Sequence, residues 1–418
     1  MLERIDGGVT AARGFMAAGT EAGIKKSGRD MAMIASTVPF KVAGTFTSNV
    51  VKAATVLYDR QIVTERKTAQ AVIVNSGVAN ACTGQEGLRI ARESAKAAAE
   101  VLNKKKAAEL GGRLESEDVL VASTGVIGVQ IPLDKIIHGA DLLADLIQPT
   151  RESGHEAALA IMTTDTRPKE AAVKMILSDG TEARIGGMCK GAGMIHPNMC
   201  TMLSFVTTDI AMDQALLQEA LRQDIVSTYN MVSVDGDTST NDTCLVMANG
   251  LAGNKEITEK NEDYETFKAA LHMVNEALAK MMAGDGEGAT CLFEVRVNHA
   301  DTLENARILA RSVVSSSLVK AAIFGHDANW GRVVCALGYS GVDFDPEKVG
   351  LVFTSANGSI TIAENGVTTD FDEDLATRVL TGDHITAICD MAMGEASAEA
   401  WGCDLTYDYV KINGDYRT

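Results

Sequence analysis

The sequence lacks several features that mark linkers, membrane anchors and exported proteins. It has only six prolines in 418 residues and no Ser/Gly-rich spacer, so its composition marks no boundary between separate domains. No apolar run approaches the length of a membrane-spanning helix, and residues 1–20 contain no apolar signal core. These absences predict one large, intertwined unit located in the cytoplasm.

Cysteine is present, but not in the spacing of a metal or redox site. None of the eight cysteines forms a Cys-x-x-Cys pair, and the histidines do not cluster near them. The sequence therefore gives no support for a zinc or thioredoxin-like motif. In a chain of this length we expect the cysteines to be buried, reduced thiols.

Basic residues are few, 38 Lys and Arg against 56 Asp and Glu, which gives a net charge of −18. Such an acidic balance disfavours nucleic acid or an anionic membrane as a partner, because both are themselves negative. Asp235, Asp237 and Asn241 alternate as in a calcium-binding loop. The bidentate glutamate that closes such a loop is missing, which argues against a metal there.

The chain does contain short β-branched runs that alternate with long amphipathic segments. Such an alternation predicts an α/β or α+β fold with intertwined halves. We expect buried strands at 71–75, 118–122, 202–209, 243–248 and 291–298, and paired strands at 170–177 with 182–187 and at 350–354 with 359–363. We expect helices from Thr83 toward Leu110, starting with a Thr83–Glu86 capping box, and at 133–147, 213–229, 262–282 and 301–319.

Polar, glycine-rich clusters interrupt this pattern, and loops of this kind often carry function. They lie at 75–80, 123–128, 190–201, 235–242, 284–288, 325–331 and 413–418. Taken singly each is a weak signal, because none matches a phosphate-binding P-loop or a G-x-G-x-x-G fingerprint. His326 lies beside Asp327, but no serine sits in a G-x-S-x-G elbow, so we interpret His326 as a structural residue.

The longest of these clusters carries a family resemblance. At Lys190–Thr201, followed by Met202 and Leu203, the sequence resembles the ornithine acetyltransferase family, also called glutamate N-acetyltransferase. It follows the family pattern Lys-Gly-x-Gly-Met-Ile-x-Pro-Asn-Met-Ala-Thr-Met-Leu except that Cys200 replaces alanine. The other clusters and Met162–Thr166 also occur in the family's order, so the resemblance covers essentially the whole chain. It implies a layered α/β fold similar to that of the self-processing aminopeptidases of the N-terminal-nucleophile type.

The resemblance also implies a precursor that cleaves itself between Cys200 and Thr201. The products would be an α chain of residues 1–200 and a β chain of residues 201–418, intertwined and held in an α₂β₂ assembly. Cleavage would give Thr201 a free α-amino group, whose reference pKa of about 7.7–8.0 suits a general base. One residue would then supply both nucleophile and base. Cys200 contributes only its carbonyl to the cut, so we expect cleavage to survive the replacement of alanine.

The activity that the resemblance implies is transfer of an acetyl group from N2-acetylornithine to glutamate, through acetyl-Thr201, in arginine biosynthesis. Thr124 and Gly125 would form the oxyanion hole. The positions that match substrate-binding residues of the family are Thr163, Lys190, Thr201, Glu287, Asn413 and Thr418, with Thr164 as an alternative to Thr163. Lys190 suits a substrate carboxylate and Glu287 a substrate ammonium group. No cofactor is implied, and whether acetyl-CoA also serves as an acetyl donor stays open.

Two other functions stay open on the sequence. A self-processing aminopeptidase or amidase of the same fold would pass the acyl group to water instead of glutamate. A non-catalytic amino-acid-binding protein would keep the scaffold without using Thr201 as a nucleophile.

Overall fold

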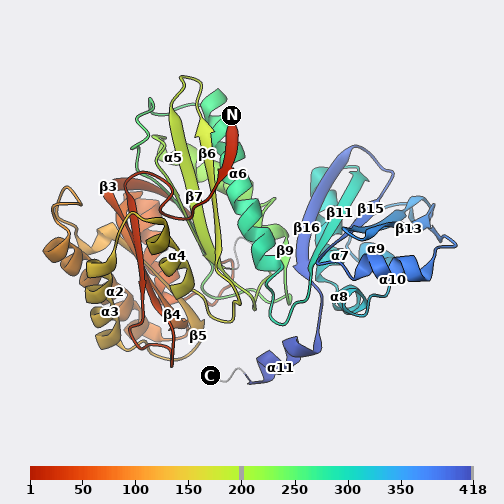
Figure 1. The fold of residues 1–418 in the computed structure, drawn as a ribbon, viewed down its shortest axis with the longest axis horizontal. Coiled ribbons are helices and arrows are strands. Elements are labelled where there is room, and N and C mark those ends of the chain that lie inside the picture. Colours follow the sequence, from red (N-terminus) through yellow and green to blue (C-terminus); the bar gives the residue numbers. More distant parts are fainter. Residues whose placement is uncertain (197–201, 416–418) are drawn as a thin grey trace.

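The computed structural model of the chain describes residues 1–196 and 202–415. Two β-sheets, each with its own helices, make up the two parts of the molecule (Figure 1). The predicted cleavage point, Cys200 and Thr201, and the last residue, Thr418, lie outside the described residues.

The first part is built on a nine-stranded sheet with the order β1-β6-β7-β8-β10-β3-β4-β5, in which β2 also pairs with β3. Its strands are β1 (Leu2–Ile5), β2 (Phe15–Thr20), β3 (Met31–Phe46), β4 (Thr68–Val78), β5 (Val119–Val126), β6 (Lys169–Ile176), β7 (Glu182–Lys190), β8 (Leu203–Thr208) and β10 (Thr243–Ala248). Strands β8 and β10 follow the predicted cleavage point, yet they lie between β7 and β3, which precede it. The two segments on either side of that point therefore share one sheet.

This sheet folds over on itself at β3. Pairing of β3 with β4 is interrupted between Ala35 and Phe40, and only the part after the interruption pairs with β10. A buried core between the two halves contains Ile34 from one and Phe205 and Leu245 from the other. The outer faces of the halves are covered by helices, α2 and α3 on one and α5 and α6 on the other.

The helices of this part are α1 (Ala54–Gln61), α2 (Gly84–Lys105), α3 (Leu133–Leu146), α4 (Arg151–Ala160), α5 (Gln214–Ile225) and α6 (Glu262–Ala283). This layered α/β arrangement confirms the predicted fold class.

The second part is built on a seven-stranded sheet with the order β14-β13-β12-β15-β11-β16-β9. Its strands are β9 (Val232–Ser233), β11 (Leu292–Ala300), β12 (Gly350–Ser355), β13 (Gly358–Glu364), β14 (Val367–Thr368), β15 (His384–Asp390) and β16 (Ala396–Cys403). Its helices are α7 (Leu303–Ser315), α8 (Ser317–Phe324), α9 (Trp330–Gly338), α10 (Glu373–Leu380) and α11 (Tyr407–Asp415). Helix α6 contacts β9, β11 and β16 and so joins the two parts. Helix α11 contains no buried residue and lies below the two sheets in Figure 1.

Every strand expected from the β-branched runs is present, but several expectations about helices are wrong, among them the helix at 213–229, which ends at Ile225. The expected helix at 301–319 is two helices, because Ser316 ends α7 and caps α8 by accepting a hydrogen bond from the Val319 N–H. Helix α2 begins after Thr83 without a capping box, since the Thr83 hydroxyl donates to Asn80 Oδ1 at 2.7 Å. It also ends at Lys105, short of Leu110.

The cysteines follow the expectation only in part. Those in the described residues are all free, and five of them are buried. Cys82 and Cys335 are exposed, so the expectation of buried thiols is wrong for these two. Cys82 lies in the turn before α2, and Cys335 lies on the face of α9 opposite its buried residues Val333, Ala336 and Leu337.

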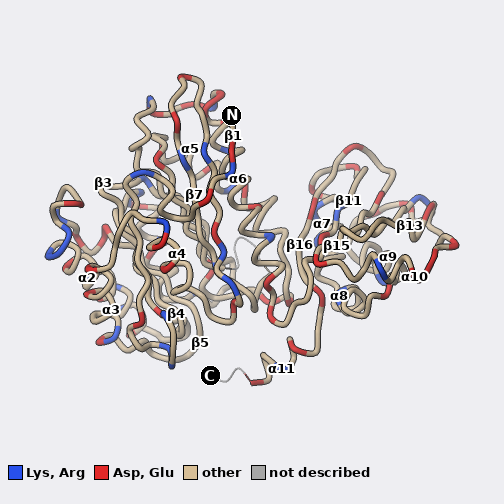
Figure 2. Tube along the Cα trace, viewed as in Figure 1, with Lys and Arg blue, Asp and Glu red and all other residues tan. Residues whose placement is uncertain are grey.

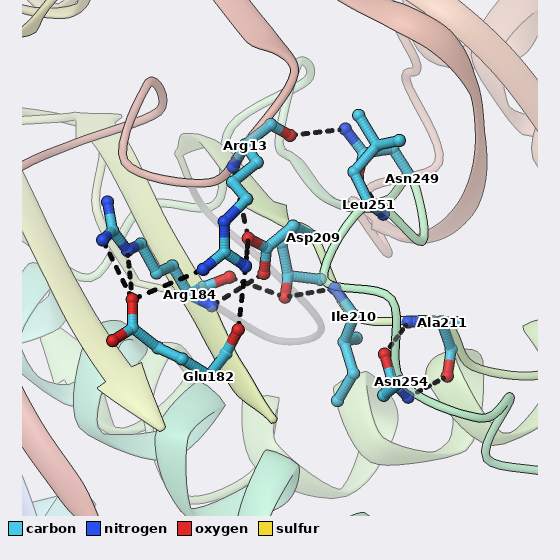
Figure 3. A network of polar contacts seen from close by, with 10 residues as sticks. Arg13, Glu182, Arg184, Asp209, Ile210, Ala211, Asn249, Leu251 and Asn254 are labelled. Carbon is cyan, nitrogen blue, oxygen red and sulfur yellow. Dashed lines mark hydrogen bonds and ion pairs between the residues drawn. The ribbon is translucent and has the colours of Figure 1, made fainter. Parts of the chain in front are cut away.

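A buried carboxylate fastens the N-terminal segment to the sheet (Figure 3). The side chain of Asp209, directly after β8, is fully buried. Its Oδ1 accepts a hydrogen bond from the Arg184 N–H at 2.7 Å, and its Oδ2 accepts from Arg13 Nη1 at 3.1 Å. Arg184 lies at the start of β7, so this network occupies the sheet edge opposite the C-terminal end of that strand. The Asp209 network therefore does not occupy the other end of β7, at Lys190, where a binding site can form.

Charged residues of both signs are interspersed over both parts of the molecule (Figure 2). Within residues 1–196 and 202–415, no helix has the length and hydropathy needed to cross a membrane.

Candidate active site

A cavity lies at the edge of the nine-stranded sheet where β5 and β7 end and β8 begins. Its space of about 730 Å³ includes the solvent at its open mouth. It is lined by six residues that the sequence predicts to bind substrate or to form the oxyanion hole, Thr124, Gly125, Thr163, Lys190, Glu287 and Asn413. Thr164 lines it as well, so both candidates of the threonine pair reach the cavity.

The lining residues come from segments that are far apart in the sequence. Thr124 and Gly125 lie at the end of β5, and Lys190 is the last residue of β7. The remaining ones come from the loop between α4 and β6, the loop after α6, and α11. Met202 and Leu203, at the start of β8, line the same cavity. The described chain thus resumes, directly after the predicted nucleophile Thr201, at the cavity wall.

The backbone at the end of β5 requires glycine. Gly125 has a φ of +128°, and a Cβ there would lie 2.3 Å from the Gly77 carbonyl carbon. No other residue can adopt this conformation and this close approach without strain. The pairing of β4 with β5 also shifts register at Gly77 and Val78, beside the positions where Thr124 and Gly125 pair with β4.

Lys190 is the cation nearest to this loop. Its side chain is buried, and its Nζ donates to the Thr124 hydroxyl at 3.4 Å. Burial lowers the pKa of Lys190 below the usual lysine value of 10.5, and this is partly offset by the carboxylate of Asp165. A buried ammonium group that lines a cavity is suited to bind an anionic group such as a carboxylate.

Beneath Lys190 lies a buried ionic network that the sequence did not reveal. The fully buried ammonium group of Lys169 lies 2.6 Å from Asp165 Oδ1 and 2.6 Å from Asp285 Oδ2. Burial alone would raise the pKa of Asp165, but the ammonium groups of Lys190 and Lys169 hold it well below its usual value. Asp165 Oδ1 also accepts from the Gly191 N–H at 2.7 Å, and its Oδ2 from the Thr163 N–H at 3.0 Å. One buried cation thereby joins three loops of the cavity.

The carboxylate of Glu287 is fixed at the cavity from two sides. Its Oε2 accepts a hydrogen bond from Asn413 Nδ2 at 2.7 Å, and its backbone N–H donates to the Ala192 carbonyl at 2.9 Å. A Cβ at Gly193 would lie 2.3 Å from the Glu287 carboxyl carbon, so glycine at this position leaves room for the carboxylate. The glycines of the 190–201 cluster thus have a steric role in the site.

The loop at 235–242 holds the segment before the predicted cut. Asp235 accepts from the backbone N–H groups of Met194 at 2.6 Å and Ile195 at 2.9 Å. Met194 has a φ of +55°, which is uncommon for a residue with a side chain. Thr238 Oγ1 donates to the His196 carbonyl at 2.9 Å. The Asp235 carboxylate therefore binds backbone donors. No group of three or more His, Cys, Asp or Glu able to hold a metal occurs among the described residues.

Comparison with known proteins identifies the family. Residues 16–418 match the ArgJ family. The chain belongs to the ArgJ family. It is 50% identical over 417 residues to a protein of Caldanaerobacter subterraneus subsp. tengcongensis and 53% identical over 420 residues to one of Symbiobacterium thermophilum, and in both comparisons all of each chain is covered. Both relatives carry the name "Arginine biosynthesis bifunctional protein ArgJ". A solved structure of ornithine acetyltransferase from Mycobacterium tuberculosis, complexed with ornithine, is 41% identical, covers 47% of this chain and 99% of its own, and has a TM-score of 0.43.

One cluster that the ArgJ-family resemblance included is not brought to the cavity. His326 and Asp327 are exposed and lie between α8 and α9, in the second part of the molecule. Trp330, which belongs to the same cluster, begins α9 with Asn329 as its N-cap. Helix α9 was not predicted, because its glycines made the segment resemble a loop.

Two further residues of the cavity wall carried no individual prediction. Asn241 and Asp242, which precede β10, line the cavity and are buried. They belong to the 235–242 cluster, so the sequence indicated the segment but not these side chains.

Proposed function

We propose that the chain is an acetyltransferase of arginine biosynthesis that moves the acetyl group from N2-acetylornithine to glutamate through acetyl-Thr201. The observation that carries this proposal is the cavity that unites the Thr124–Gly125 loop, Lys190 and Glu287 with the start of β8, directly after Thr201. Membership of the ArgJ family, whose relatives are named for arginine biosynthesis, supports the pathway.

The first reaction in this proposal is self-cleavage. The Thr201 hydroxyl attacks the Cys200 carbonyl carbon, the peptide C–N bond breaks, and the hydroxyl proton passes to the released nitrogen. Water then hydrolyses the resulting ester, which leaves a carboxylate on Cys200 and a free α-amino group and hydroxyl on Thr201. The products are an α chain of residues 1–200 and a β chain of residues 201–418.

Acetyl transfer then follows in two half-reactions. The α-amine of Thr201 takes the hydroxyl proton while the oxygen attacks the acetyl carbon of N2-acetylornithine. The Thr124 hydroxyl and the Gly125 N–H stabilise the developing oxyanion, and ornithine leaves after its nitrogen is protonated. The amine of glutamate attacks the acetyl ester in the second half-reaction and regenerates Thr201.

Substrate binding in this scheme uses the charged groups of the cavity. The Lys190 ammonium group binds the substrate α-carboxylate, and Glu287, oriented by Asn413, accepts hydrogen bonds from a substrate ammonium group. Thr163 or Thr164 and the C-terminal residue Thr418 complete the site. An α₂β₂ assembly, a cytoplasmic location, and acetyl-CoA as an additional acetyl donor belong to the same proposal and rest on the family resemblance.

The test of the proposed function is an acetyl-transfer assay combined with mass spectrometry. With N-acetylornithine as donor, ornithine release is expected to require glutamate, and N-acetylglutamate is expected to form in equal amount. Mass spectrometry of the purified protein is expected to show two chains, the second beginning at Thr201. Equal rates of ornithine release with and without glutamate would instead favour an amidase of the same fold.

The pH dependence of substrate binding gives a second expectation. Because burial lowers the pKa of Lys190, KM for N-acetylornithine is expected to rise as the pH increases through that lowered value. KM rises, and does not fall, because only the charged ammonium form of Lys190 binds a carboxylate. A Lys190→Arg variant carries a cation that does not deprotonate in this range, so its alkaline rise in KM is expected to disappear. An unchanged alkaline rise in that variant would contradict the role of Lys190.

A further inference from the structure

The loop that would form the oxyanion hole needs support from outside its own strand. The register of the β4–β5 pairing shifts at Gly77 and Val78, beside the pairs Ser76–Thr124 and Gly77–Gly125. Gly125 has a φ of +128°, which the backbone of most residues does not adopt. Donors in an oxyanion hole act by being fixed before the charge develops. Contacts from outside the strand pair therefore add to the fixation of this backbone at the register shift.

The side chain of Asn241 makes the contacts that do this. Its Nδ2 donates to the Ala79 carbonyl at 2.5 Å and to the Ser123 carbonyl at 2.7 Å. Its Oδ1 accepts from the Thr240 hydroxyl at 2.6 Å. The amide nitrogen thus donates to two carbonyl oxygens, and the amide oxygen accepts from a hydroxyl. These partners determine the orientation of the amide.

These two carbonyls flank the reactive loop. The Ser123 carbonyl belongs to the same planar peptide unit as the Thr124 N–H, so fixing that oxygen fixes the peptide from which Thr124 projects into the cavity. Ala79 follows the end of β4, the strand against which Gly125 packs. Asn241 is buried, with 6% of its surface exposed, so water does not compete freely for these bonds.

The position of Asn241 in the chain connects this loop to the nucleophile. Asn241 lies two residues before β10, and β10 pairs in parallel with β8, with Thr243 opposite Leu203. The Thr243 N–H donates to the Met202 carbonyl at 2.8 Å. The segment that holds the Thr124–Gly125 loop is therefore hydrogen-bonded to the residue that follows Thr201.

We propose that Asn241 is a positioning residue of the reaction, whose side-chain amide fixes the oxyanion loop in register with the strand that carries the nucleophile. This inference rests on the proposed function and adds to it a residue with no assigned role. Asn241 acts on the transition state through Thr124 and Gly125, and it is not required for binding the substrate's charged groups. Its loss should therefore change kcat and leave KM nearly unchanged.

The test is an Asn241→Ala variant, compared with Asn249→Ala as a matched control. Asn249 is a buried asparagine at the opposite end of β10, and its Nδ2 donates to the Arg13 carbonyl at 2.8 Å and to Ser36 Oγ at 3.1 Å. Both variants remove a buried amide from the flank of the same strand. We expect kcat to fall by about 10–100-fold in Asn241→Ala with KM within about threefold, because displacement of a catalytic group by about 1 Å costs of this order. We expect kcat to be unchanged in Asn249→Ala.

An Asn241→Asp variant provides the second measurement, since it keeps the shape of the side chain and alters its donors. The ionised carboxylate cannot donate to either carbonyl, so kcat is expected to fall at neutral pH. Protonation restores one donor, so the ratio of wild-type to variant kcat is expected to shrink as the pH is lowered.

The outcomes separate this inference from the proposed function. If Thr124→Ala lowers kcat by about 10²–10³-fold and Asn241→Ala does not lower it, the inference is wrong and the proposed function stands. A rise in KM at constant kcat in Asn241→Ala would likewise overturn it, by indicating a contact with substrate. If the wild-type protein transfers no acetyl group, the proposed function itself fails.

Discussion

A Thr201→Ala variant is expected to remain a single chain of 418 residues and to lose acetyl transfer by a factor of about 10⁴ or more. The substitution removes the hydroxyl that attacks the Cys200 carbonyl, so the peptide bond stays intact. It thereby also prevents formation of the α-amine that would act as the base. Mass spectrometry measures the first effect, and ornithine release from N-acetylornithine measures the second.

A Thr201→Ser variant is the matched control, because it keeps a hydroxyl at the same position. We expect it to cleave and to retain a measurable part of the activity. Substantial acetyl transfer by an uncleaved Thr201→Ala protein would mean that another group is the nucleophile. Unchanged binding of N-acetylornithine by a protein that never turns it over, in variant and wild type alike, would favour the amino-acid-binding alternative.

A Lys169→Met variant is expected to lower the free energy of unfolding by about 3–5 kcal/mol, the usual cost of removing one partner from a buried ion pair. The side chains of Lys169, Asp165 and Asp285 are at most 4% exposed, and the substitution leaves two carboxylates without their shared cation. Denaturant unfolding at neutral pH measures the loss. We also expect KM to rise, because the loops that hold Thr163, Lys190 and Glu287 are no longer joined.

The pH dependence of this loss has a defined sign. The pKa of Asp165 is depressed in the folded protein, so its ion pairs stabilise the fold above the unfolded pKa of about 3.9 and are lost as the pH falls through the folded value. The stability difference between wild type and Lys169→Met should therefore shrink in acid. Lys174→Met is the control, since Lys174 lies on the same strand and its cation pairs with the exposed Glu3. We expect that change to stay within about 0.5 kcal/mol, and an equal loss in both variants would contradict the role of the buried network.

The family and the layered α/β fold could be predicted from the sequence, and both predictions are confirmed. Local chemistry is sufficient for strands that carry β-branched runs, such as 118–122, whereas β1, β2, β3, β15 and β16 were not predicted. The break at Ser316 was missed since apolar periodicity continues through it from α7 into α8. The side chain of Ser316 caps α8 and so sets that boundary, and the spacing of apolar residues does not reveal such a cap.

The residues of the site were predicted unequally. Six of them line one cavity because the resemblance carried them over one by one. The cleavage point, the role of each residue and the contact of Thr418 stay predictions. Lys169 could not be found, because one of its two carboxylate partners lies 116 residues away and a lysine at the start of a strand is normally solvated. Asn241 was missed for the same reason, as its partners Ala79 and Ser123 lie more than 100 residues away.

The shared nine-stranded sheet has a consequence for the proposed cleavage. Strands β8 and β10 are inserted between β7 and β3, so the two products could separate only by breaking backbone ladders on both sides. Before the cut, one continuous chain folds by itself. After the cut, refolding requires two separate polypeptides to associate and to pair their strands in one sheet. The proposed cleavage would therefore make assembly a one-way step, and its order relative to folding would set the yield of active protein.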